Sequence, residues 1–357
     1  MFYLDFDTGR NAIYGGWFFG GGGGGIPKGG LDVLENALSS GKIIVSRMDE
    51  FKPEDTIVTA SLVGSPSTGK DAVTTEHCRR AYRLFVDSYK SPFNGIISNE
   101  TGAHSITNGW IAAAVNNLPI VDGACNGRAH PTGVMGAMSL DSKLGYHTLQ
   151  VAVGGSGEKS LELCTQGSIA STSKLVREAS TLSGGFITVL RNPVDAAYVK
   201  EHSAVGALTV CAKVGEVFLR NENKPDKLLA ELHEMLGCQI LCRGLTEDFS
   251  LVAKGGFDVG SVKVRNRNRN VEVSFWNEYM TAEDDGQRLA TFPDLIALLD
   301  ANSGLPLCSA QVKNDLKVMV VCVPKENLLL SSTMFDKNLF KPCEEAIGKA
   351  LVPYVFP

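Results

Sequence analysis

The 357-residue sequence lacks the features that mark several large protein classes. Lysine and arginine number 34 against 39 for aspartate and glutamate, so there is no basic excess to bind nucleic acid or an anionic membrane surface. No apolar run approaches the roughly 18 residues of a membrane span. The first residues include Asp5, where a signal peptide would have a basic start and then an apolar stretch. We therefore expect a cytoplasmic protein with neither nucleic acid nor membrane as partner.

The nine cysteines also lack the spacing of a disulfide framework or a structural zinc site. They are scattered along the chain, no CxxC pair occurs, and only Cys238 and Cys242 lie close together. In a reduced protein such cysteines mostly pack as small hydrophobic side chains.

The order of strand and helix patterns predicts two domains. Residues 1–160 alternate short apolar runs with amphipathic segments, which is typical of a Rossmann-like α/β domain with a parallel sheet. Within it, the apolar stretch 12–19 is expected to form a strand. Residues 161–357 contain mainly strand-like runs separated by Gly-Gly and Asp-Gly, which predicts a β-rich α+β domain. The polar stretch 154–168 is the expected boundary.

Glycine is abundant, with 38 residues, and six of them form the run Gly20–Gly25. A helical pattern follows this run, and backbone N–H groups at such a position can bind a phosphate or a carboxylate. Gly22, Gly23 and Gly24 are therefore candidate substrate-binding residues. A tight turn without a ligand is the alternative.

A second loop, GSPSTGKD at residues 64–71, has the GxxxxGK pattern of a phosphate-binding loop. The pattern requires a serine or threonine after the lysine, where its hydroxyl binds magnesium. Here Asp71 follows Lys70, and its carboxylate would repel phosphate. An ATP-dependent enzyme that uses Lys70 is accordingly the weakest functional hypothesis.

Polar side chains cluster where two neighbouring strands are expected to end. The carboxyl ends of parallel strands meet at one edge of a sheet, where ligands bind. Three kinds of site are compatible with the cluster: a divalent metal centre, such as zinc, held by His104, Cys125 and His130; a Cys125 thiolate nucleophile with nearby bases; or a hydrogen-bonding pocket. The residues of the cluster are Glu100, His104, Asp122, Cys125, Asn126, Arg128 and His130.

The second half of the chain offers fewer candidates. Arg265, Arg267 and Arg269 alternate within 264–273 and would share one face of a strand, but in an acidic protein a solvated hairpin is favoured over a grip on an anionic partner. Other polar residues, which would either form turns and caps or face a cleft, are Asn277, Glu278 and Asp294.

Taken in order, these segments resemble the S-methyl-thiohydantoin desulfurase-like family, formerly a domain of unknown function associated with hydantoinase and oxoprolinase enzymes. The resemblance covers roughly residues 13–350. It is carried by the glycine run, the strand-end Glu100 with the following glycine and alanine, the VD…GRAHP segment, and the late NE and PDLI segments. The sequence departs from the family pattern at TGAHS, which introduces His104, and at residues 124–132.

The resemblance implies a hydrolase acting on a carbon–heteroatom bond of a small five-membered cyclic amide or thioamide, with a small-molecule substrate and a homo-oligomeric state. A non-catalytic partner subunit of a hydantoinase- or oxoprolinase-type complex is the alternative. In the enzyme, Glu100 or Asp122 would be the general base, and Arg128, Asn126 and the glycine-run amides would stabilise an oxyanion. Cys125 would be the nucleophile or a metal ligand, with His104 and His130. Asn277 and Glu278 would contact the substrate.

Overall fold

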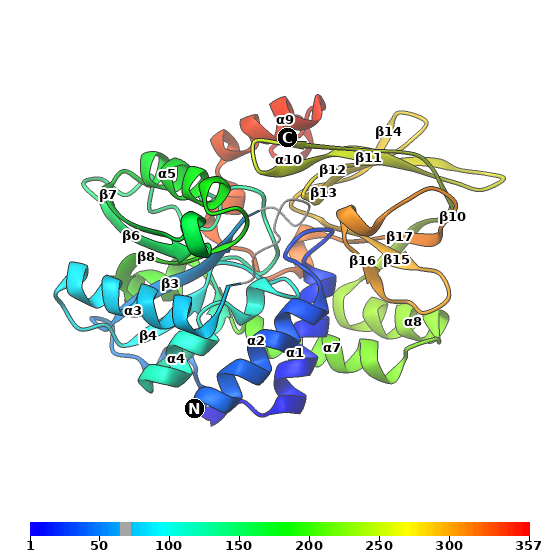
Figure 1. The fold of residues 1–357 in the computed structure, drawn as a ribbon. Helices are drawn as coiled ribbons and strands as arrows, with labels where there is room; N and C mark the ends of the chain where they lie inside the picture. Colours follow the sequence, from blue (N-terminus) through cyan, green and yellow to red (C-terminus); the bar gives the residue numbers. More distant parts are fainter. Residues whose placement is uncertain (65–72) are drawn as a thin grey trace.

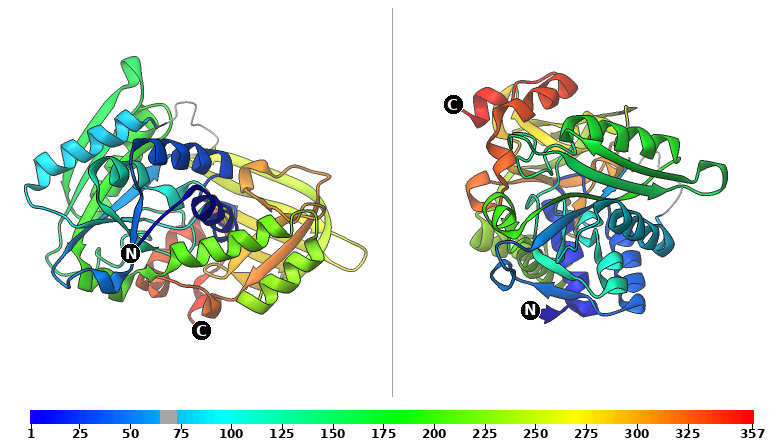
Figure 2. Two further views of the ribbon diagram at one scale, coloured as in Figure 1. Left: turned by 90° about the horizontal axis from the view of Figure 1, so that it is seen from below. Right: turned by 90° about the vertical axis from the view of Figure 1, so that its left-hand side faces the viewer.

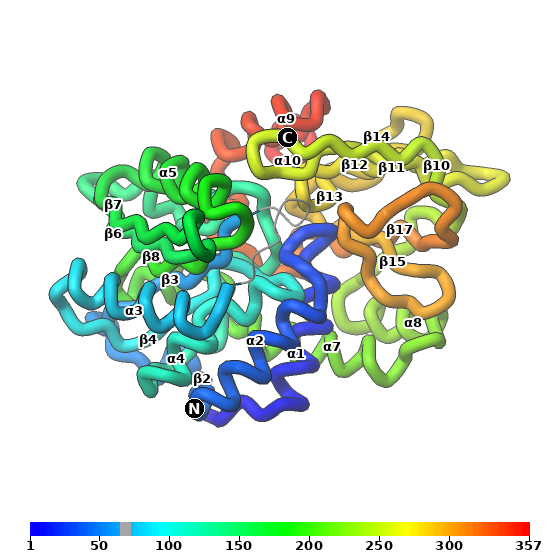
Figure 3. Tube along the Cα trace, viewed as in Figure 1, coloured from blue at the N-terminus to red at the C-terminus, as the bar shows by residue number. Residues whose placement is uncertain are grey.

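The chain folds around two β-sheets that stand side by side, as the computed structural model shows for residues 1–64 and 73–357 (Figure 1). The first sheet has the strand order β1-β2-β5-β4-β3-β8-β6-β7, with β9 paired to β5. The second sheet has the order β14-β13-β12-β11-β10-β17-β15-β16. Helices α1, α2 and α7 run below and between the sheets, and the C-terminal helices lie above them (Figures 1 and 3).

Strands of the first sheet come from the first 205 residues. β2, β5, β4 and β3 run parallel, whereas β8, β6 and β7 continue the sheet in antiparallel pairing. The bounds are β1 Phe2–Tyr3, β2 Ile44–Ser46, β3 Thr56–Val63, β4 Gly95–Ser98, β5 Pro119–Ala124, β6 Thr148–Gly154, β7 Leu161–Gly167, β8 Ile187–Asp195 and β9 Ala204–Val205.

The second sheet is antiparallel throughout its described pairs. Alternating side chains such as Val262, Val264, Val271 and Val273 bury one face, as expected for strands with period two. The bounds are β10 Gln239–Lys254, β11 Phe257–Arg265, β12 Asn270–Trp276, β13 Glu278–Asp284, β14 Gln287–Thr291, β15 Leu295–Asp300, β16 Pro306–Leu307 and β17 Lys317–Val323.

Helices cover both faces of the first sheet, and the side chains of its strands alternate between two cores. On β4, Ile96 faces the core formed with α1–α4 and α7, while Ile97 faces the opposite one. The helices are α1 Phe6–Phe19, α2 Pro27–Ser40, α3 Thr75–Tyr89, α4 Trp110–Asn116, α5 Ile169–Leu182, α6 Ala196–His202, α7 Ala207–Arg220, α8 Pro225–Leu236, α9 Lys341–Ile347 and α10 Val352–Val355.

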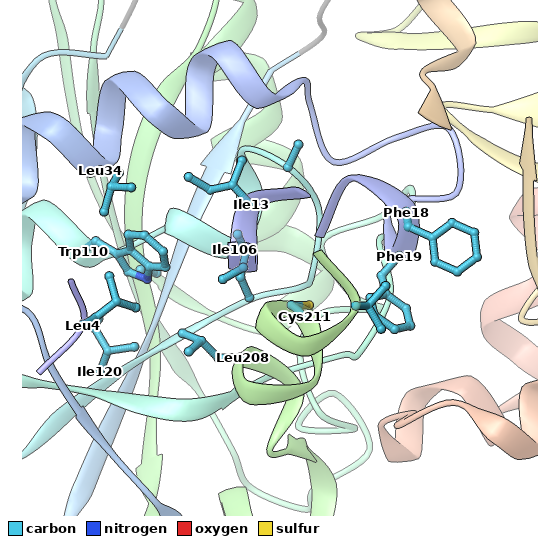
Figure 4. Close-up of a cluster of buried hydrophobic side chains, with 14 of the residues drawn as sticks. Leu4, Ile13, Phe18, Phe19, Leu34, Ile106, Trp110, Ile120, Leu208 and Cys211 are labelled. Carbon is cyan, nitrogen blue, oxygen red and sulfur yellow. The ribbon is translucent and has the colours of Figure 1, made fainter. Parts of the chain in front are cut away.

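Helices α1 and α7 pack with their backbones in contact because each has a glycine at the crossing. A Cβ on Gly15 would lie 1.9 Å from the Cys211 carbonyl oxygen, and one on Gly215 would lie 1.7 Å from that of Asn11. Phe18, Phe19, Leu208 and Cys211 pack beside this crossing, in the same core as Leu34 and Trp110 (Figure 4). This crossing fixes α1, and hence the glycine loop that follows it.

Two expectations about the fold need correction. The apolar stretch 12–19 is the end of helix α1, which begins at the Asp5 N-cap, so the glycine run joins two helices. The first sheet is mixed, since β8 and β6 pair antiparallel, and therefore differs from an all-parallel Rossmann sheet. The division expected between residues 160 and 161 lies just before β7, which pairs with β6 in the first sheet. Figure 2 shows the same arrangement from two further sides.

The arginine-rich segment forms the β11–β12 hairpin, as favoured from the sequence. Arg265 pairs with Glu247 at 3.3 Å and Arg269 with Asp284 at 3.8 Å, so these charges are partly used at the surface. In the described part of the chain, no helix combines the length and the apolar character needed to cross a membrane.

Candidate functional site

A cavity of about 380 Å³ lies between the two sheets, at the carboxyl ends of β3 and β4. Its volume falls within the roughly 300–1,000 Å³ of small-molecule sites. The glycine loop, the segment after β4 and the turn between β12 and β13 all reach it. The residues used below are Gly22–Gly25, Ile26, Leu62, Val63, Gly64, Glu100, His104, Ser105, His130, Gly133, Arg177, Phe186, Arg191, Asp258, Asn277, Glu278, Cys308 and Ser309.

Glu100 and His130 meet on one wall of the cavity. His130 Nε2 lies 3.3 Å from Glu100 Oε2, and the His130 backbone N–H donates to the same oxygen at 3.2 Å. The other neighbour of Nε2 is the Asn99 carbonyl oxygen at 3.4 Å. Since both neighbours are acceptors, Nε2 carries the proton. Burial lowers the pKa of His130, which keeps the ring neutral, and the ring holds the Glu100 carboxylate in place.

Glu278 faces the cavity from the start of β13 and is 2% exposed. Its Oε2 has no hydrogen-bond partner within the described part of the protein. Burial, and then the charge of Glu100, raises its pKa well above the usual range, against the opposing effect of Arg128. Glu278 is therefore held as a neutral carboxylic acid that can donate a proton.

The glycine loop passes directly over Glu278. A Cβ on Gly23 would lie 1.9 Å from Glu278 Oε1, so a side chain there would displace the carboxyl group. The N–H of Gly21 donates to the carbonyl oxygen of Phe18 in α1, and that of Gly23 donates to the carbonyl oxygen of Gly20. No backbone acceptor among the described residues takes a hydrogen bond from the N–H of Gly24 or Gly25. Gly22, Gly23 and Gly24, the candidate substrate-binding glycines, line the cavity together with Gly25.

His104 lies on the adjacent wall, against the same loop. A Cβ on Gly25 would lie 2.5 Å from His104 Cβ, and one on Gly29 would lie 2.7 Å from Nδ1. Burial lowers the pKa of His104 to about 4, although the charge of Asp32 acts in the opposite direction. His104 is thus a neutral ring at the site, beside Phe186 at 6.4 Å between ring centroids.

Two arginines of the cavity were not among the residues predicted from the sequence. Arg177 projects from α5, and Arg191 comes from the middle of β8. A signal was present for Arg191, because it follows the apolar run FITVL, where a charged residue is unusual. Arg177 gave no such signal, since it lies on an amphipathic helix where an arginine is ordinary.

Apolar residues and a thiol complete the lining. Ile26, Leu62, Val63 and Phe186 form the apolar part of the wall. Cys308 Sγ donates to the Gly25 carbonyl oxygen at 3.1 Å, and burial raises the pKa of its thiol to about 12. Cys308 therefore anchors the glycine loop as a neutral thiol.

Cys125 lies outside the cavity lining, in contrast to the nucleophile and ligand roles expected for it. It is fully buried among Ile97, Val121 and Met138, and its sulfur contacts Thr59 Oγ1 at 3.4 Å. Burial raises the pKa of this thiol to about 12. Cys125 is a core residue because it directly follows β5 and faces the apolar side of the sheet opposite α1.

Asp122 and Asn126 are also committed to structural contacts away from the cavity. Asp122 accepts hydrogen bonds from the backbone N–H and the hydroxyl of Thr209, in the first turn of α7. Asn126 donates to the Arg128 carbonyl oxygen and accepts from the Ser331 N–H. Both were expected to be catalytic, but neither lines the cavity.

Arg128 is fully buried behind the glycine loop and does not line the cavity either. Its Nη1 donates to the carbonyl oxygens of Pro293 and Asp294, and the guanidinium lies 4.4 Å from the centroid of the Phe292 ring. Its charge lowers the pKa of Glu278, and its Nη2 lies 2.8 Å from the position that a Cβ on Gly21 would take. The expected direct role in stabilising an oxyanion is therefore not supported.

The predicted metal centre does not form. Across residues 1–64 and 73–357, no three His, Cys, Asp or Glu side chains are placed to hold a metal ion. His104 and His130 reach the cavity, but Cys125 points into the core. The residues present therefore do not fit the zinc site proposed from the sequence.

The remaining candidates are turn residues or lie outside the described chain. Asn277 lines the cavity, but its Oδ1 accepts from the Asp258 N–H at 2.9 Å and its φ of 58° marks a turn. Asp294 accepts from the N–H groups of Thr291 and Lys325. Lys70 and Asp71, on which the nucleotide hypothesis depended, lie outside the described residues.

Fold and site together define a two-sheet protein with a cavity between its sheets that is lined by carboxyl, imidazole and guanidinium side chains. A family model described as the S-Me-THD-like N-terminal domain matches residues 10–161, and one described as the S-Me-THD-like C-terminal domain matches residues 168–336. The chain therefore belongs to the S-methyl-thiohydantoin desulfurase-like family, as the resemblance indicated.

An X-ray crystal structure of a protein from Chromobacterium violaceum has the same fold. Its TM-score is 0.74 over 97% of both chains, at 19% sequence identity. A comparison with curated proteins finds no match.

Proposed function

We propose that this protein hydrolyses the carbon–sulfur bond of an S-methyl-thiohydantoin or a closely related five-membered cyclic amide. The observation that carries the proposal is the Glu100–His130 pair, which faces the buried neutral acid Glu278 across one cavity. The family name, thiohydantoin desulfurase-like, supports this reaction class. Enzymes that run acid and base chemistry together keep two titratable groups in environments that separate their pKa values.

Glu100 serves as the general base. Its Oε2 is held by the two N–H groups of His130, and none of the described residues donates a hydrogen bond to Oε1. Oε1 can therefore orient a water molecule at the ring carbon that carries sulfur. The water oxygen bonds to that carbon while one of its protons moves to Glu100, and the ring C=N becomes C–N.

Glu278 serves as the general acid. As the carbon–sulfur bond breaks, the methylthiolate takes a proton and leaves as methanethiol. The ring nitrogen of the former C=N receives the proton that Glu100 took from the water. The added oxygen becomes the ring carbonyl of a hydantoin as its second proton passes to Glu278, which regains the proton it gave to sulfur. The reaction thus converts one substrate and one water molecule into one hydantoin and one methanethiol, with no oxidant or reductant involved. A carboxyl group with a raised pKa is suited to donate this proton near neutral pH.

The glycine loop stabilises the negative charge that develops on the substrate. Addition of water to the ring carbon places charge on atoms of the ring, and preorganised N–H donors lower the energy of that state. The N–H groups of Gly24 and Gly25 are free for this purpose, and the loop lies over Glu278. Water, not a cysteine, is the nucleophile in this mechanism, because Cys125 is buried in the core.

The test compares Glu100→Gln with Asp122→Asn on 2-methylthiohydantoin, with methanethiol release as the assay. Glutamine keeps the size of the side chain but cannot take a proton, so we expect kcat to fall by about 10²–10⁴. Asp122→Asn is the matched control, because Asp122 is also a buried carboxylate but bonds to Thr209 outside the cavity. Equal activity in Glu100→Gln and wild type would rule out this role for Glu100.

A further inference from the structure

A buried guanidinium, that of Arg191, lines the cavity and forms no ion pair with any described residue. Arg191 is 2% exposed, and its Nε has no hydrogen-bond partner within residues 1–64 and 73–357. Its Nη1 lies 3.0 Å from the position that a Cβ on Gly133 would take, so the absence of a side chain there gives it room. A guanidinium has five N–H donors, and leaving them unsatisfied in a buried site is costly.

Arg177 also lines the cavity, and among the described residues its guanidinium forms hydrogen bonds through Nη1 alone. Its Nη1 donates to the carbonyl oxygens of Gly64 at 3.2 Å and Gly256 at 3.5 Å, and its plane lies against the Phe257 ring at 4.6 Å. These contacts fix the side chain without neutralising it. Within the described chain, no carboxylate lies at ion-pair distance, 4.0 Å or less, from Arg177 or Arg191.

The two glutamates of the cavity form no ion pair with either arginine within the described chain. The charge of Glu100 acts on both arginines from beyond ion-pair distance, and Glu278 is held as a neutral acid. Both histidines, His104 and His130, are neutral rings. Asp258 lies on the wall of the second sheet, next to Asn277, and has polar interactions of its own.

We propose that Arg191 and Arg177 form a carboxylate-binding subsite, and that the substrate is an S-methyl-thiohydantoin whose ring carries an acidic substituent. The two guanidiniums would bind the carboxylate while the ring lies between Glu100 and Glu278. A planar guanidinium and a carboxylate pair through two parallel hydrogen bonds, which suits arginine to this role.

This inference names the substrate class of the site proposed above, and so rests on that function. It can nevertheless be tested by binding alone. Hydantoin-5-acetic acid and hydantoin-5-acetamide have the same shape and differ in one negative charge. Calorimetry on the full chain therefore measures the contribution of the charge directly.

We expect wild type to bind the acetate at least about tenfold more tightly than the acetamide, since hydrogen bonds to charged groups contribute about 1.5–3 kcal/mol. Arg191→Gln should remove most of this preference and leave acetamide binding intact, which also reports on folding. Arg177→Gln provides a second variant if Arg191→Gln does not fold, and Arg191→Lys should keep part of the preference. Equal affinity of wild type for both ligands, or an unchanged preference in the variants, would overturn the subsite.

Turnover separates this failure from failure of the proposed function. In one outcome, the 2-methylthio forms of the acetamide and the acetate are hydrolysed at equal rates, and binding shows no preference. This result supports the hydrolase function and contradicts the carboxylate subsite. In the other outcome, the acetate binds with the expected preference but neither 2-methylthio compound releases methanethiol. This result supports the subsite and contradicts the hydrolase function.

Discussion

The lowered pKa of His104 has a consequence for stability that can be measured. Its pKa falls from 6.5 to about 4 on folding, chiefly because burial disfavours the charged ring. A pKa that is lower in the folded state gives stability that is complete above pH 6.5 and is lost as the pH falls toward 4. Each pKa unit corresponds to about 1.36 kcal/mol, so between pH 7.5 and 4.5 the contribution is about 2 kcal/mol after solvent screening of the partly exposed ring.

Urea unfolding of wild type and His104→Gln at the two pH values isolates this contribution. Glutamine does not titrate, so the free energy of unfolding of the variant should fall less between pH 7.5 and 4.5, by about 2 kcal/mol. All other titratable groups, including His130, are common to both proteins and cancel in the comparison. The same pH dependence of the free energy of unfolding in both proteins would refute the lowered pKa of His104.

Three further substitutions test the assigned roles. Cys125→Ser should lower the free energy of unfolding by about 1–2 kcal/mol, because it places a hydroxyl in an apolar core. It should change kcat by less than about threefold, and a fall in kcat of more than about 10³ would support Cys125 as the nucleophile instead. Gly23→Ala should reduce turnover strongly with the fold retained in circular dichroism, since its Cβ would displace the Glu278 carboxyl, and unchanged kcat would contradict the position of that acid. Gly215→Ala should cost about 1–3 kcal/mol in thermal unfolding, because its Cβ would meet the Asn11 carbonyl oxygen, and an unchanged Tm would argue against the close packing of α1 and α7.

Much of the local structure could be predicted from periodicity. The strands near residues 56–64 and 148–154 and the helix at 224–236 follow directly from apolar spacing. The sequence predicts a strand over residues 12–19, where helix α1 lies, because glycines such as Gly15 and Gly16 are more typical of strand ends than of a helix interior. Their actual reason, a close approach to α7 and to Gly102, depends on tertiary packing that a single sequence does not display.

The site was predicted only in part for a related reason. The expectation that strand ends converge brought Glu100 and His130 together correctly, and the glycine run does reach the same cavity. The side to which each side chain points explains the other candidates. Asp122, on β5, bonds to Thr209 of α7, and Cys125, directly after β5, lies in a hydrophobic core, so neither reaches the cavity. Arg191 reaches the cavity from β8, which pairs antiparallel with β3. The all-parallel sheet expected from the sequence contains no such strand.

The most direct test of the account is hydrolysis of 2-methylthiohydantoin by the purified protein in water enriched in oxygen-18, followed by mass spectrometry. Attack of water on the carbon that bears sulfur predicts methanethiol release and one oxygen-18 atom in the ring carbonyl of the hydantoin, in a single turnover. Absence of methanethiol, or a hydantoin without the label, would contradict the assignment of this cavity as a site of carbon–sulfur hydrolysis.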